Sequence, residues 1–253
     1  MLFRSQFKIV FLGDYVDRGK NHLKTLEILM LIKMVFPTHI CLLRGNHDGG
    51  SFDENQTLKL PYRIPEQDDP LWYFPKYLLA LKEKNESLSD TLIHKYFEFF
   101  NALNYIAVIQ TDLGNYACIH GGLPKPIESD KPYDHLKSIS DLTQYEALDN
   151  VGATICENIM WSDPYRGEGD LKRHMRRFFY TESDFDFFGR RFGIDKLFRG
   201  HEVVDNGLRV HFEGKVFTVF SSGKAETSYY HWVNPAYVEL SPSGAYMLRR
   251  IWS

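Results

Sequence analysis

Short apolar runs in this sequence repeatedly end in a glycine beside a polar side chain. They end at Gly13-Asp14, at Gly45-Asn46-His47, at His120-Gly121 and at Gly200-His201. A continuous apolar run of this length predicts a strand that is buried on both faces. In open α/β sheets, ligands collect at the carboxyl ends of the strands, and glycine lets the backbone turn sharply there. The pattern therefore predicts an α/β fold in which these polar side chains converge on one point.

The intervening segments indicate one mixed α/β domain over residues 1–253. A strand at 8–12, a helix at 22–35 and a strand at 39–43 predict a βαβ unit with a parallel strand pair. Residues 50–90 contain several prolines and are expected to form a lid or insertion. Further expected elements are helices at 92–103 and 184–192, paired strands at 105–109 and 116–119, and an antiparallel ribbon made from 216–220, 236–240 and 246–251.

Charge and cysteine content limit the classes of partner. The formal charge is −3, so no broad basic surface is expected and nucleic acid is not expected as a partner. The three cysteines are far apart in the sequence, which argues against a disulfide framework and favours a reducing, cytoplasmic location. No apolar stretch is long enough to span a bilayer, so no membrane association is expected. The sequence leaves the oligomeric state open.

The polar groups at the strand ends are metal-ligand types. A set of carboxylate, amide and imidazole groups suits Mn²⁺, Fe or Zn²⁺. A single histidine after a strand is more often a hydrogen-bonded core residue than a ligand. The repetition of the pattern at Asp14, Asn46, His120 and His201 favours a metal site.

The same segments resemble, in order, the motifs of the PPP-type Ser/Thr protein phosphatases within the calcineurin-like metallophosphoesterases. The matching segments are Gly-Asp-Tyr-Val-Asp-Arg-Gly at 13–19, Arg-Gly-Asn-His at 44–47, His-Gly-Gly-Leu at 120–123 and Arg-Gly-His at 199–201. Trp-Ser-Asp-Pro at 161–164 and Phe-Ser at 220–221 are also similar to family segments. The resemblance covers about residues 8–222 and is weakest over 49–90. It implies the family's β-sandwich of mixed sheets flanked by helices.

The resemblance also implies a division of roles around two divalent metal ions (Mn, Fe or Zn) that activate a hydroxide. Asp14 would bridge both ions, and Asn46, His120 and His201 would complete the ligands of the second ion. Asn46 would also contact the phosphate.

The remaining roles concern the proton and the phosphate. His47 would protonate the leaving oxygen, because adjacent side chains diverge and His47 is not expected to share an ion with Asn46. Asp17 would orient His47. Arg18 would bind the phosphate oxygens, together with Arg177 or its neighbour Arg176.

One family block is not found in this sequence. The family's Gly-Asp-x-His-Gly motif, which supplies ligands to the first metal, does not precede Gly13, so Asp14 is the only expected ligand there. The chain is therefore expected to be an N-terminally shortened phosphatase for phosphoproteins or small phosphoesters. One alternative is a one-metal or inactive form that acts as a binding module. Another is a dinucleoside polyphosphate hydrolase in which Trp72, Tyr73 and Phe74 stack a base, although a loop packed by its own aromatics is favoured over that role.

Overall fold

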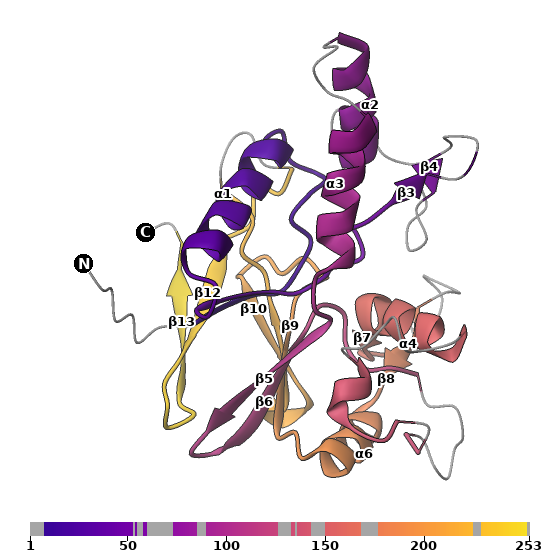
Figure 1. Cartoon of the computed structure of the whole chain (residues 1–253). Helices are drawn as coiled ribbons and strands as arrows, with labels where there is room; N and C mark the ends of the chain where they lie inside the picture. The colour runs from indigo at the N-terminus through magenta and orange to yellow at the C-terminus, as the bar shows by residue number, and fades with distance from the viewer. Residues whose placement is uncertain are drawn as a thin grey trace.

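The N-terminal part of the chain forms the expected βαβ unit. β1 (Ile9–Phe11) pairs in parallel with β2 (Ile40–Leu42), and the helix labelled α1 in Figure 1 (His22–Val35) connects them. In this computed structural model, the described residues are 8–52, 54, 58–59, 73–84, 90–125, 133–134, 136–142, 150–167, 177–224 and 229–251. The mixed α/β fold class expected from the sequence is confirmed.

A five-stranded mixed sheet, in the order β10-β11-β9-β6-β5, is the centre of the fold. The parallel pairs are β6 with β9 and β9 with β11, whereas β5 and β10 run antiparallel to their neighbours. The strands are β5 (Ile106–Thr111), β6 (Gly114–Ile119), β9 (Lys196–Arg199), β10 (Leu208–His211) and β11 (Val216–Val219).

The prediction of an antiparallel ribbon made from three C-terminal strands is wrong for the first of them, β11. β12 (Ala236–Leu240) and β13 (Tyr246–Arg250) do form an antiparallel hairpin. β11, however, lies between β9 and β10 in the five-stranded sheet. The physical reason is that Val216, Phe217 and Thr218 are all buried, which requires a central strand covered on both faces rather than a ribbon strand with one wet face.

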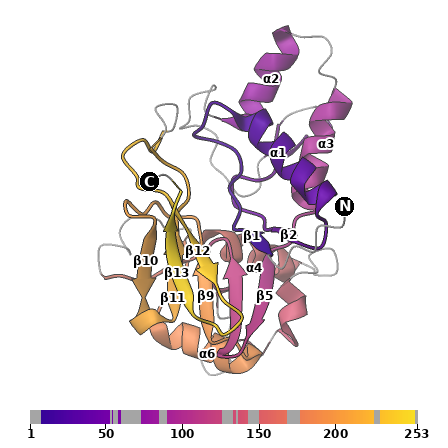
Figure 2. The same ribbon diagram turned by 90° about the vertical axis from the view of Figure 1, so that its left-hand side faces the viewer.

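Helices cover opposite ends of the sheet. α1, α2 (Phe74–Lys84) and α3 (Asp90–Asn101) lie together at one end in Figure 2, and α6 (Glu182–Phe192) lies at the other. α6 begins at a capping box between Thr181 and Asp184 and ends at Gly193, whose φ of +66° suits glycine. The remaining elements are β3 (Ser51–Phe52), β4 (Leu58–Lys59), η3 (Ile139–Leu142), α4 (Asn150–Trp161), β7 (Asp163–Pro164), β8 (Phe179–Tyr180) and η5 (Phe212–Gly214).

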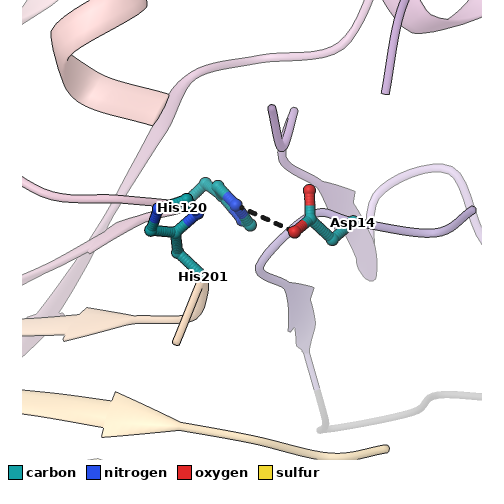
Figure 3. A group of neighbouring side chains, drawn as sticks. All are labelled: Asp14, His120 and His201. Atoms are coloured by element: carbon teal, nitrogen blue, oxygen red, sulfur yellow. Dashed lines mark ion pairs between the residues drawn. The ribbon is translucent and has the colours of Figure 1, made fainter. Parts of the chain in front are cut away.

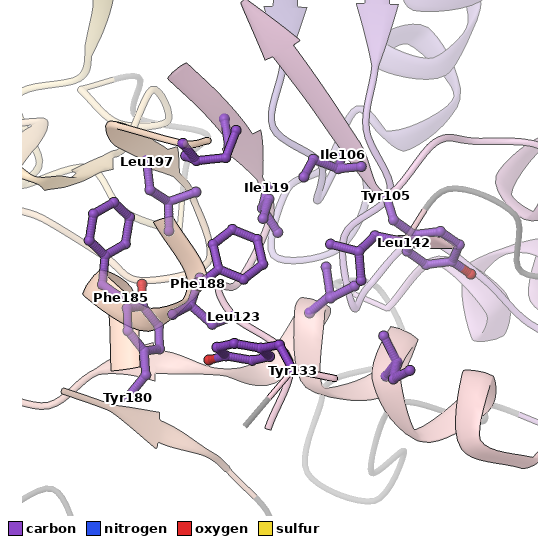
Figure 4. Packing of buried hydrophobic residues seen from close by; sticks show 14 of the residues in the cluster. Tyr105, Ile106, Ile119, Leu123, Tyr133, Leu142, Tyr180, Phe185, Phe188 and Leu197 are labelled. Atoms are coloured by element: carbon purple, nitrogen blue, oxygen red, sulfur yellow. The ribbon is translucent and has the colours of Figure 1, made fainter. Parts of the chain in front are cut away.

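Two main apolar clusters support these layers. In one, Phe185 and Phe188 of α6 pack with Tyr133 against Ile119 and Leu197 of the sheet (Figure 4). In the other, the three helices α1, α2 and α3 pack on β2. None of the helices in the described parts of the chain has the length and apolarity needed to cross a membrane.

Part of the expected lid region belongs to this second cluster. Tyr73 and Phe74 are both fully buried, and Phe74 contacts Tyr96 and Phe100 of α3 edge-on. These two rings are therefore core residues and do not present a face to a nucleotide base. Trp72 and most of residues 53–72 and 85–89 lie outside the described residues, so the lid and the single-domain organisation stay predictions.

His211 of β10 gives the fold a dependence on pH. Its Nε2 lies 3.0 Å from the Thr218 hydroxyl, and burial, together with Arg199 and Arg209, lowers its pKa to about 4. The folded state therefore keeps His211 neutral while the unfolded chain binds a proton, so stability is lost as the pH falls from about 6.5 to about 4. The expected contribution is about 2–3 kcal/mol.

Urea unfolding of the wild type and of His211→Gln at pH 7 and pH 4.5 measures this effect. Glutamine keeps a polar partner for Thr218 but does not titrate, so the variant should lose less stability on acidification. Equal losses of stability on acidification in the two proteins would contradict the role assigned to His211.

Candidate metal centre

The structure brings together the polar groups that follow β1, β2, β6 and β9. One ligand atom from each of Asp14, His120 and His201 lies within 4.8 Å of the others. Figure 3 shows the Asp14 carboxylate facing the ring of His120, at 3.3 Å between Oδ2 and Nε2. The Asn46 Oδ1 lies 3.0 Å from His120 Nε2 and 2.9 Å from His201 Nδ1. All four residues expected at the second metal are therefore in one cluster.

Close backbone approach makes this cluster possible. A Cβ on Gly13 would lie 2.5 Å from the Gly45 nitrogen, and one on Gly45 would overlap Asp14 Oδ1. The residues around the cluster also have left-handed backbones, with φ of +60° at Asp14 and +64° at His201. Such strained conformations persist at functional sites where the surrounding structure holds them.

The hydrogen bond of His120 directs one ring nitrogen into the cluster. Its Nδ1 lies 2.6 Å from the Leu12 carbonyl oxygen, which only accepts, so Nδ1 carries the proton. In the neutral ring, Nε2 then presents a lone pair toward Asp14 Oδ2 and Asn46 Oδ1. In that form of the ring, three acceptor atoms face one another, and a cation would relieve that arrangement.

The protonation states of the other two groups also suit a cation. Burial lowers the pKa of His201 well below its usual value, and the neighbouring His120, Arg199 and Arg177 add to this. Burial alone would raise the pKa of Asp14, but His120, His47 and His201 outweigh it when they are protonated and hold that pKa well below the usual range. A neutral imidazole and an ionised carboxylate are the forms that bind metal.

The donor set therefore fits a divalent cation. Asp14, Asn46, His120 and His201 would hold it, and a bound ion of this kind lowers the pKa of its water so that hydroxide is available near pH 7. Within the described residues, this is the one group of His, Cys, Asp and Glu side chains with that spacing.

His47 and Asp17 form a close pair beside the cluster. His47 Nδ1 lies 2.6 Å from Asp17 Oδ2, and the other Asp17 oxygen accepts a hydrogen bond from the Phe74 backbone N–H at 2.7 Å. The His47 backbone N–H donates to Asp14 Oδ1 at 3.0 Å. Asp17 therefore contacts His47 through Nδ1, and the role of His47 as a proton donor to a substrate stays a prediction.

The two arginines expected to bind phosphate lie in different surroundings. Arg18 Nη1 donates to the Tyr230 hydroxyl at 3.0 Å. Arg177 Nη1 donates to Asp163 Oδ2 at 2.7 Å, and its guanidinium lies over the Trp161 ring. Arg177 is thus held by a carboxylate next to His201, and its binding to phosphate stays a prediction. Arg176 lies outside the described residues.

Buried charged residues brace the cluster, and sequence reasoning assigned them no role or left it open. Asp163 accepts from the fully buried Arg199 at 2.7 Å, and Arg199 also donates to the Gly121 carbonyl and to Glu202. Arg44 donates to the Asp48 carbonyl. Arg44 and Arg199 therefore brace the turns that precede Asn46 and His201.

Asp48 is the bracing residue closest to the ligands. Its Oδ2 accepts the backbone N–H groups of Asp14 at 2.7 Å and Gly45 at 2.8 Å, and its Oδ1 accepts that of Tyr15 at 2.8 Å. It therefore ties the loop that carries Asp14 to the loop that carries Asn46. The only sequence signal was its place directly after His47.

We expect Asp48→Asn to weaken Mn²⁺ binding by about 10–100-fold, which is typical for residues that orient metal ligands. An amide has one acceptor oxygen, so one backbone N–H would face an NH₂ group instead. Isothermal titration with Mn²⁺ measures the change. Asp195→Asn is the matched control, because Asp195 also accepts a backbone N–H, from Asn115, but at the other end of β6. Equal affinities in wild type and Asp48→Asn would contradict the role.

The fold is a mixed α/β scaffold with a candidate metal centre at the ends of its strands. Residues 4–205 match the family described as calcineurin-like phosphoesterase. The chain belongs to this family, and the resemblance noted in its motifs is confirmed.

A relative with a similar sequence is also named as a phosphatase. A protein of Encephalitozoon cuniculi (strain GB-M1) named "Probable serine/threonine-protein phosphatase" is 29% identical over 229 residues, covering 90% of this chain and 43% of that protein. The chain thus spans less than half of that relative's length.

Solved structures agree with the fold. A protein serine/threonine phosphatase from Saccharomyces cerevisiae superposes with a TM-score of 0.65 at 21% identity, covering 96% of this chain and 70% of that one. A cold-active protein-tyrosine phosphatase of a psychrophilic Shewanella species superposes with a TM-score of 0.50 at 18% identity. The match covers 94% of this chain and 68% of that one. These identities are low, so the likeness concerns the fold alone.

Proposed function

We propose that this chain is a metal-dependent phosphomonoester hydrolase that acts on phosphoserine and phosphothreonine in proteins. The observation that carries the proposal is the cluster of Asp14, Asn46, His120 and His201 with the His47–Asp17 pair beside it. The family match and the name of the Encephalitozoon relative support the reaction class and the substrate class.

Each residue has a task that its surroundings suit. Arg18 binds the phosphate oxygens through its planar fork, and the Asn46 amide adds a further contact. Water attacks phosphorus, the bond to the alcohol oxygen breaks, and His47 gives its Nε2 proton to that oxygen. Asp17 holds His47 in the required tautomer. Two divalent ions, with manganese the foremost candidate, would supply the hydroxide.

The substrate is a phosphoprotein rather than a nucleotide in this proposal. The buried Tyr73 and Phe74 remove two of the three rings that a base was expected to stack on. The three cysteines are free, which agrees with a cytoplasmic setting. Neither nucleic acid nor membrane is a partner.

The test is hydrolysis of a phosphopeptide and an aryl phosphate by the purified chain, with bound metal counted in parallel. Turnover should appear with Mn²⁺, disappear after chelation and return when Mn²⁺ is added back. Turnover that does not change when the chelator is added would contradict the proposal. Metal binding without any turnover would instead favour a binding module.

A further inference from the structure

Asp17 lies in a strained part of the loop between β1 and α1. Asp17 and the next residue, Arg18, both have left-handed backbones, with φ of +74° and +53°. Neither residue is a glycine, so this conformation is unfavourable and persists only where neighbouring groups hold it. The contacts that hold the backbone here therefore decide where the Asp17 carboxylate lies.

His22, the first residue of α1, holds the backbone of Asp17. Its Nδ1 accepts a hydrogen bond from the Asp17 N–H at 3.2 Å. A backbone N–H only donates, so this ring nitrogen carries no proton and His22 is neutral, with its proton on Nε2. Only 3% of the surface of His22 is exposed, so the bond lies away from solvent.

The start of α2 holds the carboxylate of the same residue. The Phe74 N–H donates to Asp17 Oδ1 at 2.7 Å, and Asp17 Oδ2 lies 2.6 Å from His47 Nδ1. The His22 ring packs against the rings of Phe74 and Tyr77, with centroids 5.7 Å and 5.2 Å apart. The first residues of α1 and α2 therefore meet at Asp17, where one accepts from its N–H and the other donates to its carboxylate.

We propose that His22 is a positioning residue that fixes the Asp17 backbone and so keeps the Asp17 carboxylate on His47. The inference rests on the proposed function, in which His47 protonates the leaving oxygen. Without an acceptor at position 22, the strained backbone of Asp17 relaxes, and rotation there moves the carboxylate. A shift of about 1 Å takes the 2.6 Å contact with His47 beyond hydrogen-bond distance.

Two substitutions separate this role from simple packing in the core. His22→Leu removes the acceptor and keeps an apolar side chain beside Phe74. His22→Asn removes the ring but keeps an acceptor, because the amide oxygen takes about the place of Nδ1. Tyr77→Leu is the matched control, since it removes a ring contact of His22 and leaves the hydrogen bond to Asp17 in place.

Steady-state kinetics on a phosphoserine peptide and an activated aryl phosphate measure the effect. We expect His22→Leu to lower kcat/KM for the peptide by about 10–100-fold, because a displacement of about 1 Å at a catalytic group can cost about 10²-fold. The aryl phosphate, whose leaving oxygen needs no proton, should change little. His22→Asn and Tyr77→Leu should stay close to the wild type on both substrates. Equal losses on the two substrates, or equal losses in His22→Leu and His22→Asn, would overturn the proposal.

Amide hydrogen exchange separates this inference from the proposed function. Measured by NMR without metal or substrate, the exchange rate of the Asp17 N–H reports its hydrogen bond whether or not turnover occurs. It should rise about 10-fold in His22→Leu, the effect of one hydrogen bond, and stay near the wild-type rate in His22→Asn. An unchanged rate in His22→Leu would contradict the role of His22. The expected change in a protein that hydrolyses no phosphoester would support the contact and contradict the proposed function alone.

Discussion

Replacing His47 with asparagine should lower turnover on phosphoserine peptides by roughly 10²–10⁴-fold, the usual loss when a general acid is removed. The serine alkoxide is a poor leaving group, and in the proposed mechanism His47 protonates it. For an aryl phosphate with an activated phenol, the leaving oxygen needs no proton, so the loss should be much smaller. Steady-state kinetics on both substrates give the ratio of losses, which is the decisive quantity.

Metal binding is the internal control for His47→Asn. The side chain of His47 is not among the predicted ligands, although its backbone N–H donates to Asp14. Mn²⁺ affinity should therefore match that of the wild type. Asp17→Asn should show the same dependence on the leaving group but more mildly, because Asp17 acts through His47. Loss of metal in His47→Asn, or equal losses on good and poor leaving groups, would remove the acid role.

Replacing Asp14 with asparagine should abolish metal binding and turnover together. The carboxylate is the one formal negative charge in the cluster of Asp14, Asn46, His120 and His201, and it faces two imidazoles. We expect Mn²⁺ affinity to fall by more than about 100-fold, beyond the loss seen for residues that only orient ligands. The loss of turnover should be the same for phosphopeptide and aryl phosphate, in contrast to His47→Asn.

The control for Asp14→Asn is Asp112→Asn, in the exposed turn between β5 and β6. It makes the same chemical change far from the ligands and should keep wild-type affinity and turnover. Circular dichroism should show that both variants are folded. Full Mn²⁺ affinity in Asp14→Asn would contradict its assignment as a ligand.

Local sequence pattern predicted the elements that carry the site. The helix expected at 22–35 has those bounds in the structure, because its apolar spacing is regular and Pro37 follows it. The convergence of Asp14, His120 and His201 was predicted from the glycine-flanked ends of the strands. In the structure, β6 and β9 run parallel, so His120 and His201 follow them at the same edge of the sheet. Their roles as ligands stay predictions until metal is measured.

Features that depend on long-range packing were not predictable from the sequence. β10 was missed because its alternating Leu208-Arg-Val-His211 segment is too short and polar to stand out. α4 was missed within a segment without clear periodicity. The hydrogen bond between Arg18 and Tyr230 joins residues 212 positions apart. Asp48 and Asp163 acquire their roles only from partners that the fold delivers.

The most direct test of the central claim is anomalous diffraction from crystals grown with Mn²⁺, recorded on both sides of the manganese absorption edge. We expect an anomalous peak enclosed by the Asp14 carboxylate, the Asn46 amide oxygen and the rings of His120 and His201. Asp14→Asn crystals grown in the same way should lack that peak. Wild-type crystals with manganese bound only elsewhere, or with no peak at saturating Mn²⁺, would contradict the assignment of this cluster as a metal centre.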